Sequence, residues 1–221
     1  MDNTRRIVLA TGNADKVSEL AAMLAGTTMK VLGLSAFPSI GEIEETGSTF
    51  EENALTKARH VAGITGLVSL ADDSGIVVDV LAGAPGVYSA RYADDWEAKP
   101  GENRDERNIR KLLHMMAAVP EARRSCRFVS CIAAVRPDGA ELTVRGEWEG
   151  RVLTAPRGEN GFGYDPVFLD AALDKTAAEL SREEKNARSH RGKALRGLLT
   201  RLPAFMAVGG ALQRALKRRN I

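Results

Sequence analysis

The apolar positions of the chain fall into short continuous runs and into longer stretches with helical spacing. Arg5 to Thr11 is a short apolar run bounded by Gly12-Asn13, which is typical of a buried strand. Ala14 to Leu24 has apolar residues spaced three and four apart, as on one face of a helix, and Met29 to Leu34 is again extended. Strand, helix and strand in this order predict a crossover unit and an α/β fold.

The next stretch of the chain repeats the alternation of helix and strand. Thr49 and Glu52 have the spacing of a capping box, which predicts the start of a helix that runs to about Ile64. Leu67 to Ala71 is a β-rich apolar run, and we expect this strand to end at Asp72-Asp73-Ser74-Gly75. Ile76 to Val80 is expected to continue in an extended conformation.

The second half of the chain predicts a helix followed by a hairpin. Glu106 to Ala118 is amphipathic and reads as a helix. Arg127 to Val135 is rich in β-forming residues and predicts a strand. Pro137-Asp138-Gly139 predicts a turn, after which Glu141 to Val144 forms the second strand of a hairpin. Because a hairpin pairs its strands antiparallel, the sheet is expected to be mixed.

The last third begins with a glycine-rich loop, Ala155 to Pro166, and ends in helices. Ser181 and Glu184 form another capping box, so a helix is expected to begin there. Ser189 to Gly192 interrupts that helix, and Leu195 to Met206 is expected to be a further one. No linker divides the chain, so we predict one domain over residues 1–221, with two lobes that share one sheet.

Composition narrows the class of protein. With 44% hydrophobic and 27% charged residues and a net charge of +2, the chain gives no reason to expect nucleic-acid or membrane binding. No apolar run approaches the roughly 18 residues that span a bilayer, and the N-terminal run is too short for a signal peptide. Cys126 and Cys131 lie ~16 Å apart along an expected strand, too far for a disulfide. Free thiols and no export signal predict a cytoplasmic protein.

The first candidate for chemistry is the strand-to-helix junction at Thr11 to Lys16. A glycine turn followed by helix N-terminal amides and a lysine suits a phosphate group. The sequence lacks the GxxxxGK[ST] pattern of a Walker loop. The same pattern also fits an asparagine N-cap with a surface lysine.

The second candidate is the acidic sequence Asp72-Asp73-Ser74-Gly75. Adjacent carboxylates repel each other unless a cation is near, and hard oxygen ligands suit Mg²⁺. Glu44 and Glu45 could complete a metal site from a loop, although such a pair is more often solvated surface. A plain turn is the structural alternative for the Asp-Ser-Gly segment.

The third candidate combines an aromatic loop with a cationic helix start. Phe162, between two glycines, could stack on a base, and Asp165 could accept from a ring N–H. The segment Ser181 to Lys193 could aim Lys185, His190 and Arg191 at a nucleotide. Aromatic plugs of the core and a solvated cationic face explain the same residues without a ligand.

Several segments together resemble one enzyme family, in consistent order from about residue 5 to 200. They read TGNxxKxxE at 11–19, EETGxTFxENAxxKA at 44–58, ADDSG at 71–75, GAPGxYSARY at 83–92, GFGYDPVF at 161–168 and TAAELSREEKNARSHRGKAL at 176–195. In these motifs the chain closely resembles the inosine triphosphate pyrophosphatase family, the RdgB-type pyrophosphatases of deaminated purine nucleoside triphosphates.

The resemblance implies an activity and a fold. Members hydrolyse ITP, dITP and XTP to the monophosphate and pyrophosphate with Mg²⁺, which cleanses the nucleotide pool. Their fold is α/β, an elongated mixed sheet flanked by helices, with two lobes, a central cleft and usually a homodimer.

The resemblance also assigns residues. Asp73 falls on the proton acceptor, Glu44 and Asp73 fall on the metal, and we expect Lys57 to balance the charge of the triphosphate. The substrate-binding positions are Thr11, Gly12, Asn13, Ala14, Asp15, Lys16, Lys57, Ser74, Phe162, Gly163, Tyr164, Asp165, Lys185, His190 and Arg191.

The chain departs from the family pattern in two places, the polar loop after Tyr92 and the tail from Ala207 to Ile221. Two other functions remain open at this point. One is a Maf-like pyrophosphatase for dTTP or UTP, although the SHRGKAL block favours purines. The other is a nucleotide-sensing or RNA-binding module without catalysis.

Overall fold

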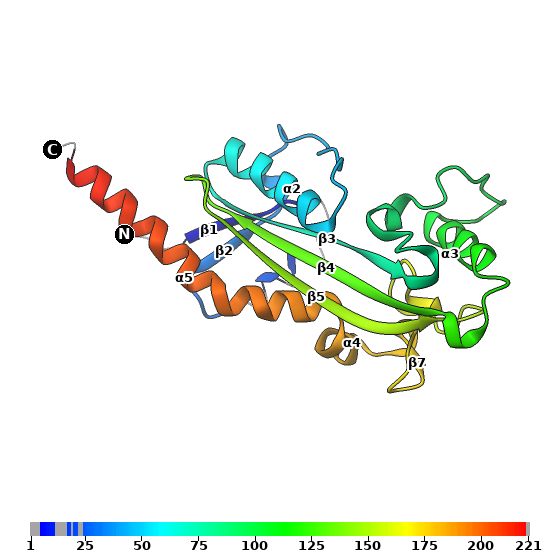
Figure 1. The fold of residues 1–221 in the computed structure, drawn as a ribbon. Coiled ribbons are helices and arrows are strands. Elements are labelled where there is room, and N and C mark those ends of the chain that lie inside the picture. Colours follow the sequence, from blue (N-terminus) through cyan, green and yellow to red (C-terminus); the bar gives the residue numbers. More distant parts are fainter. Residues whose placement is uncertain (1–4, 12–16, 19, 22–23, 220–221) are drawn as a thin grey trace. The chain divides into compact units, whose positions relative to one another are not determined.

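The computed structural model describes residues 5–11, 17–18, 20–21 and 24–219, with the backbone alone described from 208 onward. Within this part of the chain, seven strands form one sheet (Figure 1). Its order is β2 (Met29–Leu32), β1 (Arg5–Leu9), β3 (Val68–Val78), β4 (Ser125–Val135), β5 (Glu141–Val152), β6 (Phe168–Asp170) and β7 (Lys175–Thr176).

The sheet is mixed, as predicted. β1 pairs in parallel with both β2 and β3, whereas β6 pairs antiparallel with β5 and with β7. The parallel pair of β1 and β2 is the one expected of the predicted crossover unit at the start of the chain. The predicted helix over Ala14 to Leu24 lies largely outside the described residues.

Residues 17–18 and 20–21 are helical, and four α-helices and six 3-10 turns are described with their bounds. The α-helices are α2 (Phe50–Thr65), α3 (Arg104–Met115), α4 (Arg182–Arg188) and α5 (His190–Arg219). The 3-10 turns are Leu34–Ala36, Asp79–Leu81, Gly86–Arg91, Glu121–Arg123, Asp165–Val167 and Ala177–Glu179.

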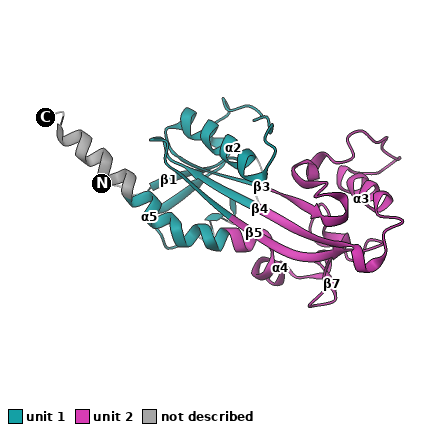
Figure 2. Cartoon of the chain, viewed as in Figure 1, with its two compact units in different colours: residues 1–73, 131–144, 195–221 teal, residues 74–130, 145–194 magenta. Residues whose placement is uncertain are grey.

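The chain divides into two compact units (Figure 2). Unit 1 comprises residues 1–73, 131–144 and 195–221, and unit 2 comprises residues 74–130 and 145–194. The long strands β3, β4 and β5 each contribute residues to both units.

Unit 1 packs α2 closely against its strands. The predicted capping box begins this helix, with the Thr49 hydroxyl accepting from the Glu52 N–H and the Glu52 side chain returning to the Thr49 N–H. Three alanines of α2 pack against alanine and valine side chains of the sheet, while Val61 of the same helix packs with Val8 of β1. The buried cluster consists of Ala54, Ala58, Ala62, Ala71, Ala133 and Val135.

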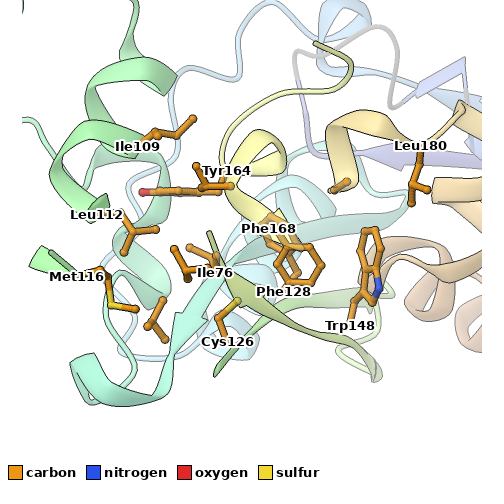
Figure 3. Close-up of a cluster of buried hydrophobic side chains, with 14 residues drawn as sticks. Ile76, Ile109, Leu112, Met116, Cys126, Phe128, Trp148, Tyr164, Phe168 and Leu180 are labelled. Atoms are coloured by element: carbon orange, nitrogen blue, oxygen red, sulfur yellow. The ribbon is translucent and has the colours of Figure 1, made fainter. Parts of the chain in front are cut away.

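Unit 2 is built around aromatic side chains. The Phe128 ring lies 4.4 Å from that of Phe168, and Trp148 lies 4.8 Å from Phe168, measured between ring centroids. Figure 3 shows these rings together with Ile109 and Leu112 of α3, which pack into the same cluster. These large apolar side chains hold α3 and the strands of unit 2 in one core.

Two sequence predictions need correction. Asp72 to Gly75 does not end a strand, because β3 continues through it as one strand of eleven residues. The last helix does not begin at Leu195 and stop at Met206; α5 starts at His190, includes Pro203 and continues to Arg219. The apolar alternation on both sides of the Asp-Ser-Gly segment extends the strand, so the polar residues stand within it.

No helix among the described residues is both long enough and apolar enough to cross a bilayer.

Candidate active site

A lysine in unit 1 joins three oxygen acceptors. Lys57 Nζ, on α2, donates to Glu45 Oε1 at 2.6 Å, to Asp73 Oδ1 at 2.8 Å and to the backbone oxygen of Asp72 at 3.1 Å. An ammonium group has three N–H donors, so each donor of Lys57 has a protein partner in this structure. The sequence placed Lys57 with the phosphates; the structure pairs it with the acidic residues of the site.

Asp73 is a nearly buried carboxylate, 8% exposed. Its second oxygen accepts from Asn53 Nδ2 at 3.3 Å, and Asn53 is itself fully buried on α2. The Asn53 side-chain oxygen accepts from Gly47 N–H at 2.8 Å, which ties the acidic loop before α2 to the same cluster. A Cβ on Gly47 would lie 2.7 Å from that oxygen, so the close approach requires glycine.

The charges in this cluster act on each other. Burial raises the pKa of Asp73, and the Glu45 carboxylate raises it further, while Lys57 lowers it. The net result is a pKa of Asp73 above its ordinary value. Burial lowers the pKa of Lys57, but the carboxylates of Asp73 and Glu45 more than compensate and raise it. A carboxylate with a raised pKa is better suited to accept a proton near neutral pH.

The predicted metal ligands fit Mg²⁺ by their chemistry. Glu44 is exposed, and the neighbouring Glu45 is the one whose carboxylate shares Lys57 with Asp73. Among the described residues there is no group of three or more His, Cys, Asp or Glu that could hold a metal. Mg²⁺ is commonly held by one or two carboxylates together with substrate phosphates, and the side chains of Glu44 and Asp73 are ligands of that chemical class.

Unit 2 carries an exposed aromatic ring beside two cations. Phe162 is 61% exposed, with Lys185 Nζ 4.9 Å and the Arg191 guanidinium carbon 5.6 Å from its ring centroid. Arg191 donates to the Ser74 hydroxyl at 3.0 Å. A large apolar ring left in solvent beside cations is the arrangement that stacks on a flat ligand.

The aromatic loop is anchored by its other predicted residues. Asp165 is 3% exposed and accepts from the Phe162 N–H at 2.9 Å and from the Lys185 ammonium. Tyr164 is buried, and its hydroxyl donates to the Ser89 backbone oxygen at 2.9 Å. Burial raises the pKa of Tyr164. We interpret Asp165 and Tyr164 as supports that hold the loop under Phe162.

His190 lies inside the aromatic core of unit 2. It is 7% exposed, and its ring stacks on Phe128 with 4.8 Å between centroids and 20° between planes. It begins α5 next to Arg191, so its packing fixes the start of the helix that carries Arg191.

The remaining predicted positions lie in the first strand-to-helix junction. Thr11 is described, and its backbone oxygen accepts from the Leu34 N–H at 3.2 Å. Gly12, Asn13, Ala14, Asp15 and Lys16 lie outside the described residues.

Sequence reasoning missed two polar residues. Asn53, within the matched motif, holds Asp73, and Asp105, on α3, accepts from the Gly163 N–H at 2.7 Å. The EETGxTFxENAxxKA match contains Asn53, so an asparagine on the buried face of α2 was an available signal. No sequence signal marked Asp105, because an acidic residue in the first turn of a helix is common.

The chain matches known proteins over most of its length. A model of the Ham1 family matches residues 7–201. The dITP/XTP pyrophosphatase of Nitratidesulfovibrio vulgaris is 59% identical over 199 residues, covering 90% of this chain and 96% of that protein. The dITP/XTP pyrophosphatase of Symbiobacterium thermophilum is 52% identical, covering 93% and 98%. The solved HAM1 protein of Coxiella burnetii is 44% identical, with a TM-score of 0.83 over 90% of this chain and 99% of that one.

Proposed function

Because the chain belongs to the Ham1 family, we propose that it hydrolyses deaminated purine nucleoside triphosphates, among them ITP, dITP and XTP, to the monophosphate and pyrophosphate. Curated relatives that are 59% and 52% identical bear the name dITP/XTP pyrophosphatase. The observation that carries the proposal is Asp73, a carboxylate only 8% exposed and held by Lys57 and Asn53. Removal of such triphosphates would cleanse the nucleotide pool.

In this proposal Asp73 is the proton acceptor. It orients a water for in-line attack at the α-phosphorus and takes its proton, and pyrophosphate leaves. Asn53 and Lys57 fix the orientation of the carboxylate, since each holds one of its oxygens. The raised pKa of Asp73 makes proton transfer from water less unfavourable.

We propose that the reaction depends on Mg²⁺. Glu44 and Asp73 would hold the ion, and when bound it would neutralise negative charge on the phosphate oxygens. Thr11, Gly12, Asn13, Ala14, Asp15 and Lys16 would contact the triphosphate, as the resemblance implies.

Phe162 is the proposed stacking surface for the base. Hypoxanthine and xanthine carry a keto oxygen at position 6, and cationic donors such as Lys185 and Arg191 can meet it. Adenine carries an amino group there, which leaves donor facing donor. A buried polar group without a partner costs ~1–3 kcal/mol, so two such mismatches would reject adenine by ~10²–10⁴-fold.

The proposed base site includes further residues that hold the aromatic loop and the start of α5 in place. They are Gly163, Tyr164, Asp165, His190 and Ser74. Ser74 accepts from Arg191, which limits the positions that the guanidinium can take. His190 acts in this proposal from its packed position at the start of α5.

The assembly and location are proposals of the same kind. The family resemblance favours a homodimer. A cytoplasmic location is supported by the cysteine usage, since Cys126 and Cys131 are buried free thiols.

A nucleotide panel tests the proposed function. Pyrophosphate and orthophosphate release would be measured from ITP, dITP, XTP, GTP, ATP, dTTP and UTP, with and without Mg²⁺. We expect pyrophosphate from the first three, little from ATP, and none without the metal. Preferential hydrolysis of dTTP or UTP would favour a Maf-like enzyme, and binding of ITP without hydrolysis would favour a nucleotide sensor.

A further inference from the structure

The exposed ring of Phe162 stands on a loop between two glycines. Gly161 and Gly163, on either side of it, have φ of +82° and +61°. Glycine reaches these angles without strain, but it also adopts many others, so the glycines alone do not hold the ring in one place. The Asp165 N–H donates to the Phe162 backbone oxygen at 3.3 Å, and the backbone N–H groups of Phe162 and Gly163 add further restraint.

Each of these amides donates to a different carboxylate. The Phe162 N–H donates to Asp165 Oδ2 at 2.9 Å, within the same loop. The Gly163 N–H donates to Asp105 Oδ2 at 2.7 Å, and Asp105 belongs to α3. The contact with Asp105 therefore ties the tip of the loop to a separate element of unit 2.

Asp105 is itself held on a well-anchored helix. Asn103 caps α3 and forms a capping box with Glu106, so the helix end has its cap without Asp105. Asn108, one turn later, is buried; it accepts from the Ala93 N–H at 2.8 Å and donates to the Ala90 oxygen at 3.2 Å. The Asp105 carboxylate is therefore not needed to cap its own helix, and it accepts from the loop while α3 is held by Asn103 and Asn108.

We propose that Asp105 is a positioning residue for base recognition, which fixes Phe162 through the amide of Gly163. This inference rests on the proposed function, because it assigns Phe162 to the base. Asp105 does not touch the nucleotide in this account. It restricts the loop to the conformation in which the ring can stack. The loop therefore loses little conformational entropy when the base binds.

Kinetics give the first test. Asp105→Ala removes the acceptor, and we expect kcat/KM for ITP to fall by about tenfold, mostly through KM, since a hydrogen bond to a charged group is lost. Asp105→Asn keeps a side-chain oxygen at the same distance and should stay within about threefold of the wild type. Hydrolysis of ribose 5-triphosphate, which has no base, should not change in either variant.

Asp95→Ala is the matched control. Asp95 also lies in unit 2 and also pairs with α3, through Lys111 Nζ at 2.6 Å, but it makes no contact with the aromatic loop in the structure. Its removal should leave the kinetics for both substrates unchanged. If Asp105→Ala does not fold, Asp105→Ser replaces it, because serine suits a first helical turn but is too short to reach the Gly163 amide.

A readout without substrate separates this inference from the proposed function. 4-Trifluoromethylphenylalanine at position 162 would report the state of the ring by ¹⁹F NMR. We expect a single resonance in the labelled wild-type background, in Asp105→Asn and in Asp95→Ala, and a shifted or exchange-averaged one in Asp105→Ala.

The outcomes are distinct. An unchanged ¹⁹F resonance in Asp105→Ala, or equal losses with ITP and ribose 5-triphosphate, would overturn the positioning role. A wild type that hydrolyses no deaminated purine triphosphate would overturn the proposed function instead, and the ¹⁹F spectrum alone would then decide whether Asp105 fixes Phe162.

Discussion

Two clusters of candidate residues, one in each compact unit, differ in how they expose their side chains to solvent. In unit 1, Asp73, Lys57 and Asn53 are largely buried, and their polar groups are paired with one another. In unit 2, Phe162 is left 61% exposed, and only the loop beneath it is tied down. The first cluster buries charged side chains, whereas the second exposes an apolar ring to solvent.

The difference indicates what each cluster is built to do. Burying a pair of charged side chains costs desolvation free energy. Buried charges with shifted pKa values are therefore found most often where a reaction needs them. An exposed ring on a supported loop loses little order when a flat ligand covers it. We therefore assign the reaction to the cluster of Asp73 and recognition of the base to the cluster of Phe162. The following variants are chosen to break that division of labour.

The largest effect is expected at Asp73. Asp73→Asn keeps the size of the side chain but removes the proton acceptor, so kcat for ITP should fall by ~10²–10⁴-fold. The matched control is Glu141→Gln in unit 1, which neutralises an exposed carboxylate paired with Arg59. Steady-state assays of pyrophosphate release measure both. An Asp73→Asn enzyme with nearly normal kcat would remove Asp73 from this role.

Lys57 should matter for stability as well as rate. Lys57→Met leaves the Asp73 and Glu45 carboxylates without their ammonium, which should lower the free energy of unfolding by about 3 kcal/mol. Arg59→Met, on the same helix, breaks an exposed pair with Glu141 and should change stability little. Urea unfolding at neutral pH compares the two. Equal losses in both variants would show that burial of the pair is unimportant.

Phe162→Ala should act on binding. Base stacking on an aromatic ring contributes ~1–3 kcal/mol, so kcat/KM for ITP should fall by about 5- to 150-fold. Tyr88→Ala is the matched control, because Tyr88 is also exposed, at 58%, and also lies beside a guanidinium, that of Arg91 at 5.2 Å. A similar loss of kcat/KM in both variants would mean that any exposed ring of unit 2 serves equally well.

The smallest effect concerns a buried carboxylate in unit 2. Burial by itself would raise the pKa of Asp170, but donors from Arg188, Trp148 and the Ala172 amide outweigh it and the pKa is lowered. Asp170 therefore contributes stability that is present above its unfolded pKa of ~3.9 and is lost as pH falls through the lower folded value.

The measurement compares thermal unfolding of the wild type and Asp170→Asn between pH 6 and pH 2. Trp148, whose indole N–H donates to Asp170 at 3.0 Å, reports the transition by fluorescence. The variant should be less stable at pH 6, and the gap should narrow below about pH 4. A gap that stays constant with pH would contradict the lowered pKa. Asp170 thus provides the structural counterpart to Asp73, whose pKa shifts the other way.

Much of the fold could be predicted from the sequence because its signals are local. The capping boxes at Thr49 and Ser181 begin α2 and α4, and the Asp-Gly turn joins β4 to β5. The prediction divided the strand β3 at Asp72 to Gly75, because four polar or small residues look like a turn. The structure continues the strand through them next to β4, and pairing between strands is not local in the sequence.

Candidate site residues could be named from the sequence, but their contacts could not. The motifs named Asp73, Lys57 and Phe162, but the partners of each depend on the fold. Nothing in the sequence tells that Lys57 donates to Glu45 and Asp73, or that Asp105 holds the aromatic loop. Such contacts join residues far apart in the chain, so the structure was required to find them.

One comparison of substrates tests the division of labour most directly. The kcat/KM values for ITP and for ribose 5-triphosphate would be measured in the wild type, Asp73→Asn and Phe162→Ala. The account predicts that Asp73→Asn lowers both values by the same factor, while Phe162→Ala lowers the value for ITP alone. Equal losses for the two substrates in Phe162→Ala, or a loss confined to ITP in Asp73→Asn, would contradict it.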